Sequence, residues 1–146
     1  MKIYTIGFTK KSAERFFTLL KKNAVKTLID VRLNNVSQLA GFAKKDDLAY
    51  FLRELCEIHY LHMPILSPSE DILKGYKAKT LSWAEYEVKF NALLQHRAAE
   101  TLLDEEVLEG ACFLCSEHNA EKCHRRLVAE YIASHYQSNI AIKHLK

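Results

Sequence analysis

The chain of 146 residues has the length of one domain with a substantial buried core. Its 49% hydrophobic and 27% charged content is that of an ordinary globular protein, and no apolar run is long enough to cross a membrane. A net charge of +3 gives nucleic-acid binding only weak support. Four cysteines in a chain that can build its own core indicate a reducing compartment, so we expect a cytoplasmic protein.

The first half of the chain alternates between apolar runs and segments with helical spacing of apolar residues. A serine stands where the first helix should begin, and a serine is a good helix cap. The predicted elements are a strand, a helix, a second strand, a polar loop and a helix: Ile3–Ile6, Ser12 to about Lys22, Thr27–Val31, Asn34–Lys45, and Asp46 to about Ile58.

The second half continues the alternation. Ser82 and Glu85 form a capping-box pattern, which marks the start of a long helix. The predicted strands are Tyr60–Met63, Ala111–Leu114 and Ile140–Leu145, and the predicted helices are a short one after Ser67-Pro68-Ser69, then Ser82–Arg97, Ala98–Leu108 and about Lys122–Tyr136. The direction of the last strand does not follow from the sequence.

This order of elements predicts one α/β domain over residues 1–146. We expect a mainly parallel sheet of about five strands with helices on both faces, a Rossmann-like layering. Ligands of such sheets bind outside the carboxyl ends of the strands. Thr9, Arg32 and Cys115 each follow or end a predicted strand, so we expect them to meet at one edge.

The densest group of reactive side chains is Cys115-Ser116-Glu117 followed by Cys123-His124-Arg125. It lies where an apolar strand ends and a helix begins, and the positive end of a helix favours a thiolate. We predict a catalytic cluster of Cys115, Glu117, Cys123 and His124, with either thiol as the reactive group and Glu117 moving a proton. Both cysteines could instead be packing residues.

A metal is the other chemistry open to this cluster. Cys115, Cys123 and His124, with His118 or Glu117, could supply four ligands. Adjacent residues of a helix diverge by about 100°, which makes joint ligation by Cys123 and His124 awkward. We therefore expect no metal and no other cofactor. Cys112 and Cys115 are three apart on a strand and face opposite sides, which argues against a redox pair.

Residues at the ends of the predicted strands suit an anionic ligand. Gly7 and Thr9 offer backbone N–H groups and a hydroxyl, while Arg32 and Arg125 offer guanidinium groups that can clamp a carboxylate or phosphate. We predict that these four residues bind the ligand.

Several short motifs together resemble a known family, the prokaryotic domain-of-unknown-function family 488. The residues that carry the resemblance run nearly from end to end: Thr5-Ile6-Gly7-Phe8-Thr9, Asp30-Val31-Arg32, Phe42, Tyr60, Cys115-Ser116-Glu117, Cys123-His124-Arg125 and Ile142-Lys143-His144-Leu145. The family typically has Ser in place of Thr9 and a Pro soon after the Asp-Val-Arg motif, where this chain has Asn34-Asn35. The resemblance implies an α/β domain and brings no established reaction.

We predict a cytoplasmic, enzyme-like protein that binds a small anionic ligand, such as a nucleotide or another phosphate-bearing compound, at the C-terminal edge of the sheet. One alternative is a non-catalytic nucleic-acid-binding module that uses the same basic rim. Another is a metal-binding protein that uses Cys115, Cys123 and His124. No membrane partner is expected.

Overall fold

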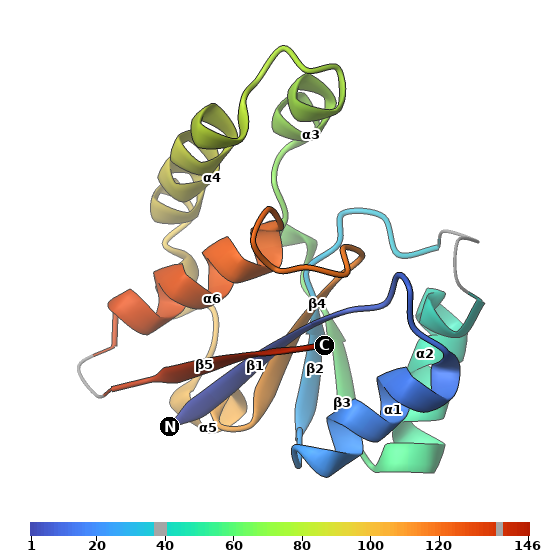
Figure 1. The fold of residues 1–146 in the computed structure, drawn as a ribbon. Helices are drawn as coiled ribbons and strands as arrows, with labels where there is room; N and C mark the ends of the chain where they lie inside the picture. The colour runs from blue at the N-terminus through green and yellow to red at the C-terminus, as the bar shows by residue number, and fades with distance from the viewer. Residues whose placement is uncertain (37–40, 137–138) are drawn as a thin grey trace.

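A sheet of five parallel strands lies at the centre of the fold (Figure 1). The computed structural model describes residues 1–36, 41–136 and 139–146. The strands are β1 (Lys2–Gly7), β2 (Thr27–Asp30), β3 (His59–His62), β4 (Ala111–Cys115) and β5 (Ala141–Leu145). Their order is β3-β2-β4-β1-β5, and each neighbouring pair is parallel, including β5 with β1. The predicted α/β class and parallel sheet are confirmed.

Helices flank the sheet. Those in the described part of the chain are α1 (Ala13–Lys22), α2 (Lys45–Phe51), α3 (Glu70–Lys77), α4 (Trp83–His96), α5 (Glu105–Leu108) and α6 (His124–Ser134). The hairpin of α3 and α4 projects away from the sheet in Figure 1. No helix in the described ranges combines the length and the apolar character that a membrane crossing requires.

Two hydrophobic cores cover the two faces of the sheet. Successive strand residues point to opposite faces, so Ile3 packs in one core and its neighbour Tyr4 in the other. The first core is completed by α4 and α6, which contribute Phe90 and Leu127. The second is completed by α1 and its neighbours, with Phe16 fully buried. Helices cover both faces of the sheet, as predicted (Figure 1).

The segment between α4 and β4 is not the single helix predicted over Ala98–Leu108. Ala98 adopts a left-handed conformation (φ 50°), which no helix can continue through. A 3₁₀ turn, Ala99–Thr101, and the short α5 take its place. Asp104 has an extended backbone and separates the 3₁₀ turn from α5.

The helix predicted from Asp46 to Ile58 is also shorter. It ends at Phe51 and continues as one π-helical segment, Leu52–Cys56, before Glu57 turns the chain with φ 56°. The predicted loop Asn34–Lys45 contains a 3₁₀ turn at Gly41–Ala43. Residues 37–40 of that loop lie outside the described residues.

The two predicted helix caps are present. The Ser12 hydroxyl accepts a hydrogen bond from the Arg15 amide at 3.1 Å. Ser82 and Glu85 bond to each other's backbone N–H groups, which completes the capping box at the start of α4. These local signals therefore placed the starts of α1 and α4 correctly.

The end of β1 packs against the loop between β4 and α6 at unusually close range. A Cβ atom on Gly7 would lie 1.6 Å from the carbonyl oxygen of Glu117, a distance no side chain tolerates. The next turn strengthens the contact, because the amide and hydroxyl of Thr9 both donate to the carbonyl of Ser116, at 3.1 and 2.8 Å. Gly7 is thus required by the close approach of this loop.

We expect Gly7→Ala to lower the free energy of unfolding by about 3 kcal/mol or more, because an added methyl group would force the loop off the sheet. Urea denaturation measures this change. Gly41→Ala is the matched control, since no atom of the described residues lies within 4 Å of a Cβ atom there, and it should change stability by less than about 0.5 kcal/mol. Equal losses in both variants would contradict the packing described.

Candidate functional site

The carboxyl ends of β1, β2 and β4 lie at one edge of the sheet. β4 pairs with both other strands, and the registers place Gly7 opposite Cys115 and Asp30 opposite Leu114. The residues that follow these strands are therefore neighbours in space. The structure thus brings the predicted site residues to one edge, and their individual contacts differ in kind.

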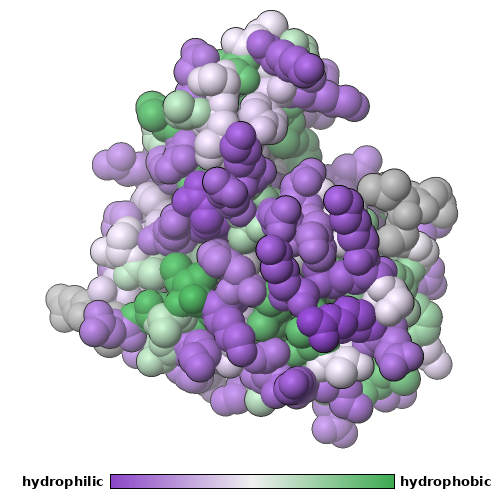
Figure 2. All heavy atoms as spheres, viewed as in Figure 1, coloured by the Kyte–Doolittle hydropathy of each residue, from purple (hydrophilic) through white to green (hydrophobic). Residues whose placement is uncertain are grey.

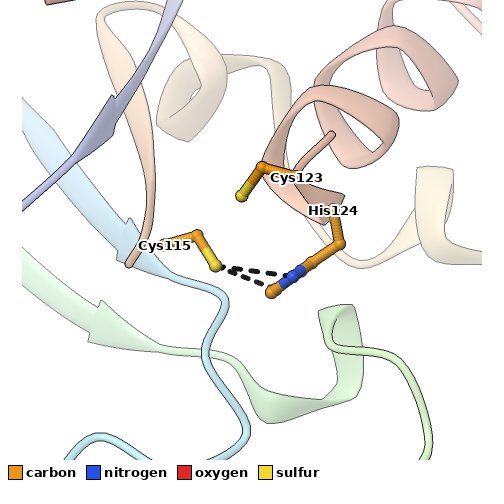
Figure 3. Close-up of side chains that lie close together, drawn as sticks. All are labelled: Cys115, Cys123 and His124. Atoms are coloured by element: carbon orange, nitrogen blue, oxygen red, sulfur yellow. Dashed lines mark hydrogen bonds between the residues drawn. The ribbon is translucent and has the colours of Figure 1, made fainter. Parts of the chain in front are cut away.

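Cys115, Cys123 and His124 form a compact buried group, called here the thiol–imidazole group (Figure 3). Cys115 ends β4, Cys123 is the N-cap of α6, and His124 is the first residue of that helix. Their two sulfur atoms and one ring nitrogen all lie within 4.8 Å of one another. The expectation that Cys123 and His124 diverge is wrong, because Cys123 has an extended backbone (φ −136°, ψ 140°) rather than a helical one.

The hydrogen bonds of His124 define its protonation. Nε2 lies 2.7 Å from the carbonyl oxygen of Val31, so this nitrogen carries the proton and donates it. Nδ1 is then the acceptor, and it faces Cys115 Sγ at 3.4 Å. Burial lowers the pKa of His124, which favours the neutral imidazole. The ring packs edge-on against Phe90 and is held in one orientation.

The two thiols of the group differ in acidity. The hydrogen bond from Cys123 lowers the pKa of Cys115, with help from the backbone of Ser116 and the charge of Arg125, and against the effect of burial. The same bond raises the pKa of Cys123, and burial raises that pKa further. The pair therefore favours a thiolate on Cys115 and a protonated thiol on Cys123.

Arg125 is fully buried and binds the segments around the thiols. Its Nε donates to the Thr5 hydroxyl at 3.2 Å, and its Nη2 to the carbonyl of His118 at 3.3 Å. Nη1 donates to the carbonyl of Glu117 and lies 3.5 Å from Cys123 Sγ. Among the described residues, no carboxylate lies within 4 Å of this guanidinium.

Arg32 is also buried, but it has a carboxylate partner. Asp30 accepts from Nε at 2.8 Å and from Nη2 at 2.7 Å, and Nη2 also donates to the carbonyl of Ala43. The hydroxyl of Tyr60 donates to the same carboxylate at 2.6 Å and accepts from Asn35. This network neutralises Arg32. Sequence analysis gave Asp30 and Tyr60 no role, although the Asp-x-Arg spacing at a strand end is a signal for such a pair.

The remaining predicted site residues make structural contacts. Gly7 and Thr9 hold the loop after β4, and Glu117 contributes its backbone carbonyl to Arg125 while its side chain is exposed. Ligand binding by Gly7 and Thr9, and proton transfer by Glu117, stay predictions.

A pocket opens beside the thiol–imidazole group. Its volume is about 320 Å³, and it is lined by Phe8, Arg32, Leu33, Asn34, Leu73, Cys115, Ser116 and His124. Cys115 and His124 are only 5% and 7% exposed, so they form its base rather than its rim. The guanidinium of Arg32 lies over the Phe8 ring, 5.2 Å from its centre. A small ligand in this pocket would contact the reactive atoms.

The fold and site define an α/β protein with a buried thiol–imidazole group at the carboxyl edge of a parallel sheet. A family model, described as Domain of unknown function DUF488, matches residues 12–132, and the chain belongs to this family. The match begins after β1 and ends before β5. Comparison with curated proteins and with solved structures found no match.

The Asp30–Arg32 pair should carry a large share of stability at this edge. We expect Asp30→Ala to lower the free energy of unfolding by about 3–5 kcal/mol, because it leaves a buried guanidinium without its anion. Urea denaturation measures the loss. The double variant Asp30→Leu, Arg32→Met removes both charges and should recover about half of it or more.

Tyr60→Phe is the control for the same network. It removes the hydrogen bonds of the hydroxyl with Asp30 and Asn35 and keeps the ion pair, so it should cost about 1–2 kcal/mol, less than Asp30→Ala. An Asp30→Ala variant no less stable than Tyr60→Phe would show that the carboxylate does not balance Arg32.

Proposed function

We propose that this protein is a thiol-dependent enzyme in which Cys115 is the nucleophile and a small ligand with an anionic group occupies the adjoining pocket. The observation that carries the proposal is the 3.4 Å contact between Cys115 Sγ and His124 Nδ1 at the base of that pocket. A nucleophile, a base within hydrogen-bond reach and a group that orients the base are the parts that such catalysis requires. The carbonyl of Val31 orients His124.

The charge of Arg125 supports a thiolate in this group. A buried guanidinium without a counter-charge is costly, and no carboxylate of the described residues lies within 4 Å of it. Cys123 Sγ is 3.5 Å away, and the Cys123 thiol in turn lowers the pKa of Cys115. One negative charge, on Cys115, balances Arg125 across this short chain of contacts.

The proton of Cys115 has a defined path. As Cys115 ionises, this proton passes to Nδ1 of His124, and once the imidazolium has released it, the thiolate is left beside a neutral ring with Arg125 as its counter-charge. Because burial lowers the pKa of His124, the imidazolium gives this proton up readily and can return it to a leaving group. The Cys123 thiol and the backbone of Ser116 stabilise the Cys115 thiolate once the proton has left.

The pocket suits a ligand with an apolar part and one anionic group. Phe8, Leu33 and Leu73 supply apolar walls. Arg32 uses Nε and Nη2 for Asp30 and Ala43, and its Nη1 has no hydrogen-bond partner among the described residues. Nη1 can therefore donate to an anion in the pocket, and Asn34 and Ser116 are further polar lining residues. The reducing compartment expected from the free cysteines is part of this proposal.

Alkylation of the native protein tests the nucleophile. With iodoacetamide at neutral pH, we expect Cys115 to be labelled faster than Cys56, Cys112 or Cys123, as measured by mass spectrometry of peptides. Burial raises the pKa of Cys56 and of Cys112, whereas the pKa of Cys115 is lowered by its bond from Cys123. The pH midpoint of labelling should therefore be lower for Cys115 than for Cys56.

Two substitutions at Cys123 form a matched pair for this experiment. Cys123→Ala removes the donor to Cys115, raises the pKa of that thiol and should slow its labelling about fivefold at neutral pH, the equivalent of one hydrogen bond. Cys123→Ser keeps a donor and should label nearly as wild type. Small phosphate esters and carboxylates that bind the pocket should protect Cys115. Faster labelling of Cys56, or equal rates at all four cysteines, would contradict the proposal.

A metal centre is a second candidate function. It is favoured by the ligand atoms of Cys115, Cys123 and His124, which all lie within 4.8 Å of one another. Catalytic zinc sites have three protein ligands and one open position, and a zinc-bound histidine usually donates its other N–H, as Nε2 of His124 does to Val31. Charge argues against it. Zinc with two thiolates is neutral, which would leave the buried Arg125 unbalanced unless the open position held an anion.

We therefore expect the purified protein to hold less than one equivalent of zinc or iron by elemental analysis. The measurement should follow mild purification without a chelator, because a chelator would strip a three-ligand site. A full equivalent in wild type that is lost in Cys123→Ser would favour the metal centre over the thiolate.

A further inference from the structure

A second group of titratable side chains lies at the same edge of the sheet, where β1, β4 and β5 end. It consists of Lys10, Lys11, His118 and Lys146 and is called here the cationic cluster. These residues come from three segments, namely the turn between β1 and α1, the loop between β4 and α6, and the residue after β5. The parallel pairing of β1 with β4 and β5 brings these segments together.

One direct contact joins two members of the cationic cluster, and backbone bonds hold the segments around them. The Lys11 ammonium lies 3.3 Å from Nδ1 of His118, so two groups that can both carry positive charge are in contact. Arg15 of α1 donates to the backbone oxygen of Lys146, which ties the helix to the end of β5. The Thr9 hydroxyl and amide fix the neighbouring loop through Ser116. The backbone segments that carry the cluster are therefore held by hydrogen bonds.

The positive charges of the cluster have no anionic partner in the described structure. The ion pairs found there belong to Arg32, Arg53, Lys74 and Arg126, and none involves a lysine of the cluster. Burial lowers the pKa of Lys11 to about 8, and the surrounding positive charges lower it further. Partial burial and Lys11 also lower the pKa of His118. An anion would relieve both effects.

The cluster adjoins a hollow with room for more than an ion. This hollow has a volume of about 720 Å³, and Asn119, Ala120, Glu121, Arg126, His144 and Lys146 line it. The charge of Arg126 is already paired with Glu130 and Glu87. Glu121 is the one carboxylate among the residues that line the hollow, and its negative charge would oppose an anion there. The end of β5, marked C in Figure 1, lies in a mostly hydrophilic part of the face shown in Figure 2.

We infer that the cationic cluster binds a phosphate group, with Lys11 and His118 as its direct partners and Lys10 and Lys146 as supporting charges. The remainder of the ligand would extend into the adjoining hollow. This site is separate from the pocket at Cys115 and does not depend on the thiol chemistry proposed above.

The number and kind of donors favour phosphate over carboxylate. Three lysines carry three formal charges, which a phosphate monoester dianion balances better than a single carboxylate. Ammonium groups act as point charges that surround a tetrahedral anion, whereas planar carboxylates are matched by guanidinium groups. Protonation of His118 on binding would add a further donor at 3.3 Å from Lys11.

Titration with three probes tests the site. Inorganic phosphate, adenosine monophosphate and a short oligothymidylate are added separately at low ionic strength, with the ring-proton NMR signals of His118 reporting location and calorimetry reporting affinity. We expect the His118 signals to shift with saturation, and Lys11→Ala to weaken binding about tenfold or more. Lys77→Ala, an exposed lysine on α3, is the control and should bind as wild type.

The probes also separate the two sources of phosphate. Tightest binding of the mononucleotide, with a shallow salt dependence, supports a small phosphate ester; tightest binding of the oligonucleotide, with a steep one, supports a nucleic-acid backbone at the same site. Cys115→Ser should bind as wild type, so a failed thiol mechanism would not alter this result. Unshifted His118 signals with all three probes, or undiminished affinity in Lys11→Ala, would overturn the inference.

Discussion

The guanidinium of Arg125 joins three parts of the molecule at the carboxyl edge of the sheet. It reaches β1 through Thr5, the loop after β4 through two carbonyls, and the N-cap of α6 through Cys123. Such a group can be buried only if each donor is satisfied and its charge is balanced. The requirement for satisfied donors explains the close loop at Gly7. The charge of Arg125 also helps to lower the pKa of Cys115, after the larger effects of the Cys123 thiol and the Ser116 backbone.

Asp30 and Arg32 play the corresponding part on the other side of the pocket. Their ion pair, extended by Tyr60, fixes the turn that follows β2 and holds one wall of the pocket. The two buried arginines differ in what balances them, a carboxylate for Arg32 and sulfur for Arg125.

Much of the architecture follows from local signals. Apolar runs such as Ala111–Leu114 and the caps at Ser12 and Ser82 depend on neighbouring residues only, so the sequence predicts the strands, α1 and α4. The helix predicted over Ala98–Leu108 fails because a non-glycine residue takes a left-handed conformation, which local propensity disfavours.

The candidate site was predictable in its residues but not in their contacts. The thiols, His124 and both arginines stand out in the sequence, and the parallel sheet brings them to one edge. Arginine is normally a surface residue, so full burial of Arg125 contradicts the usual expectation. The extended backbone of Cys123 likewise depends on contacts with residues far along the chain, which spacing does not reveal.

Cys123 also has a cost for the helix it begins. Serine, threonine, aspartate and asparagine cap helices by accepting a hydrogen bond from the first turn, and Cys123 makes no such bond. A search for more stable variants would replace it early, with a gain of about 1 kcal/mol for a good cap. The residue best for α6 and the residue suited to the thiol pair are therefore different. Selection for stability alone would therefore favour sequences without the Cys115–Cys123 pair.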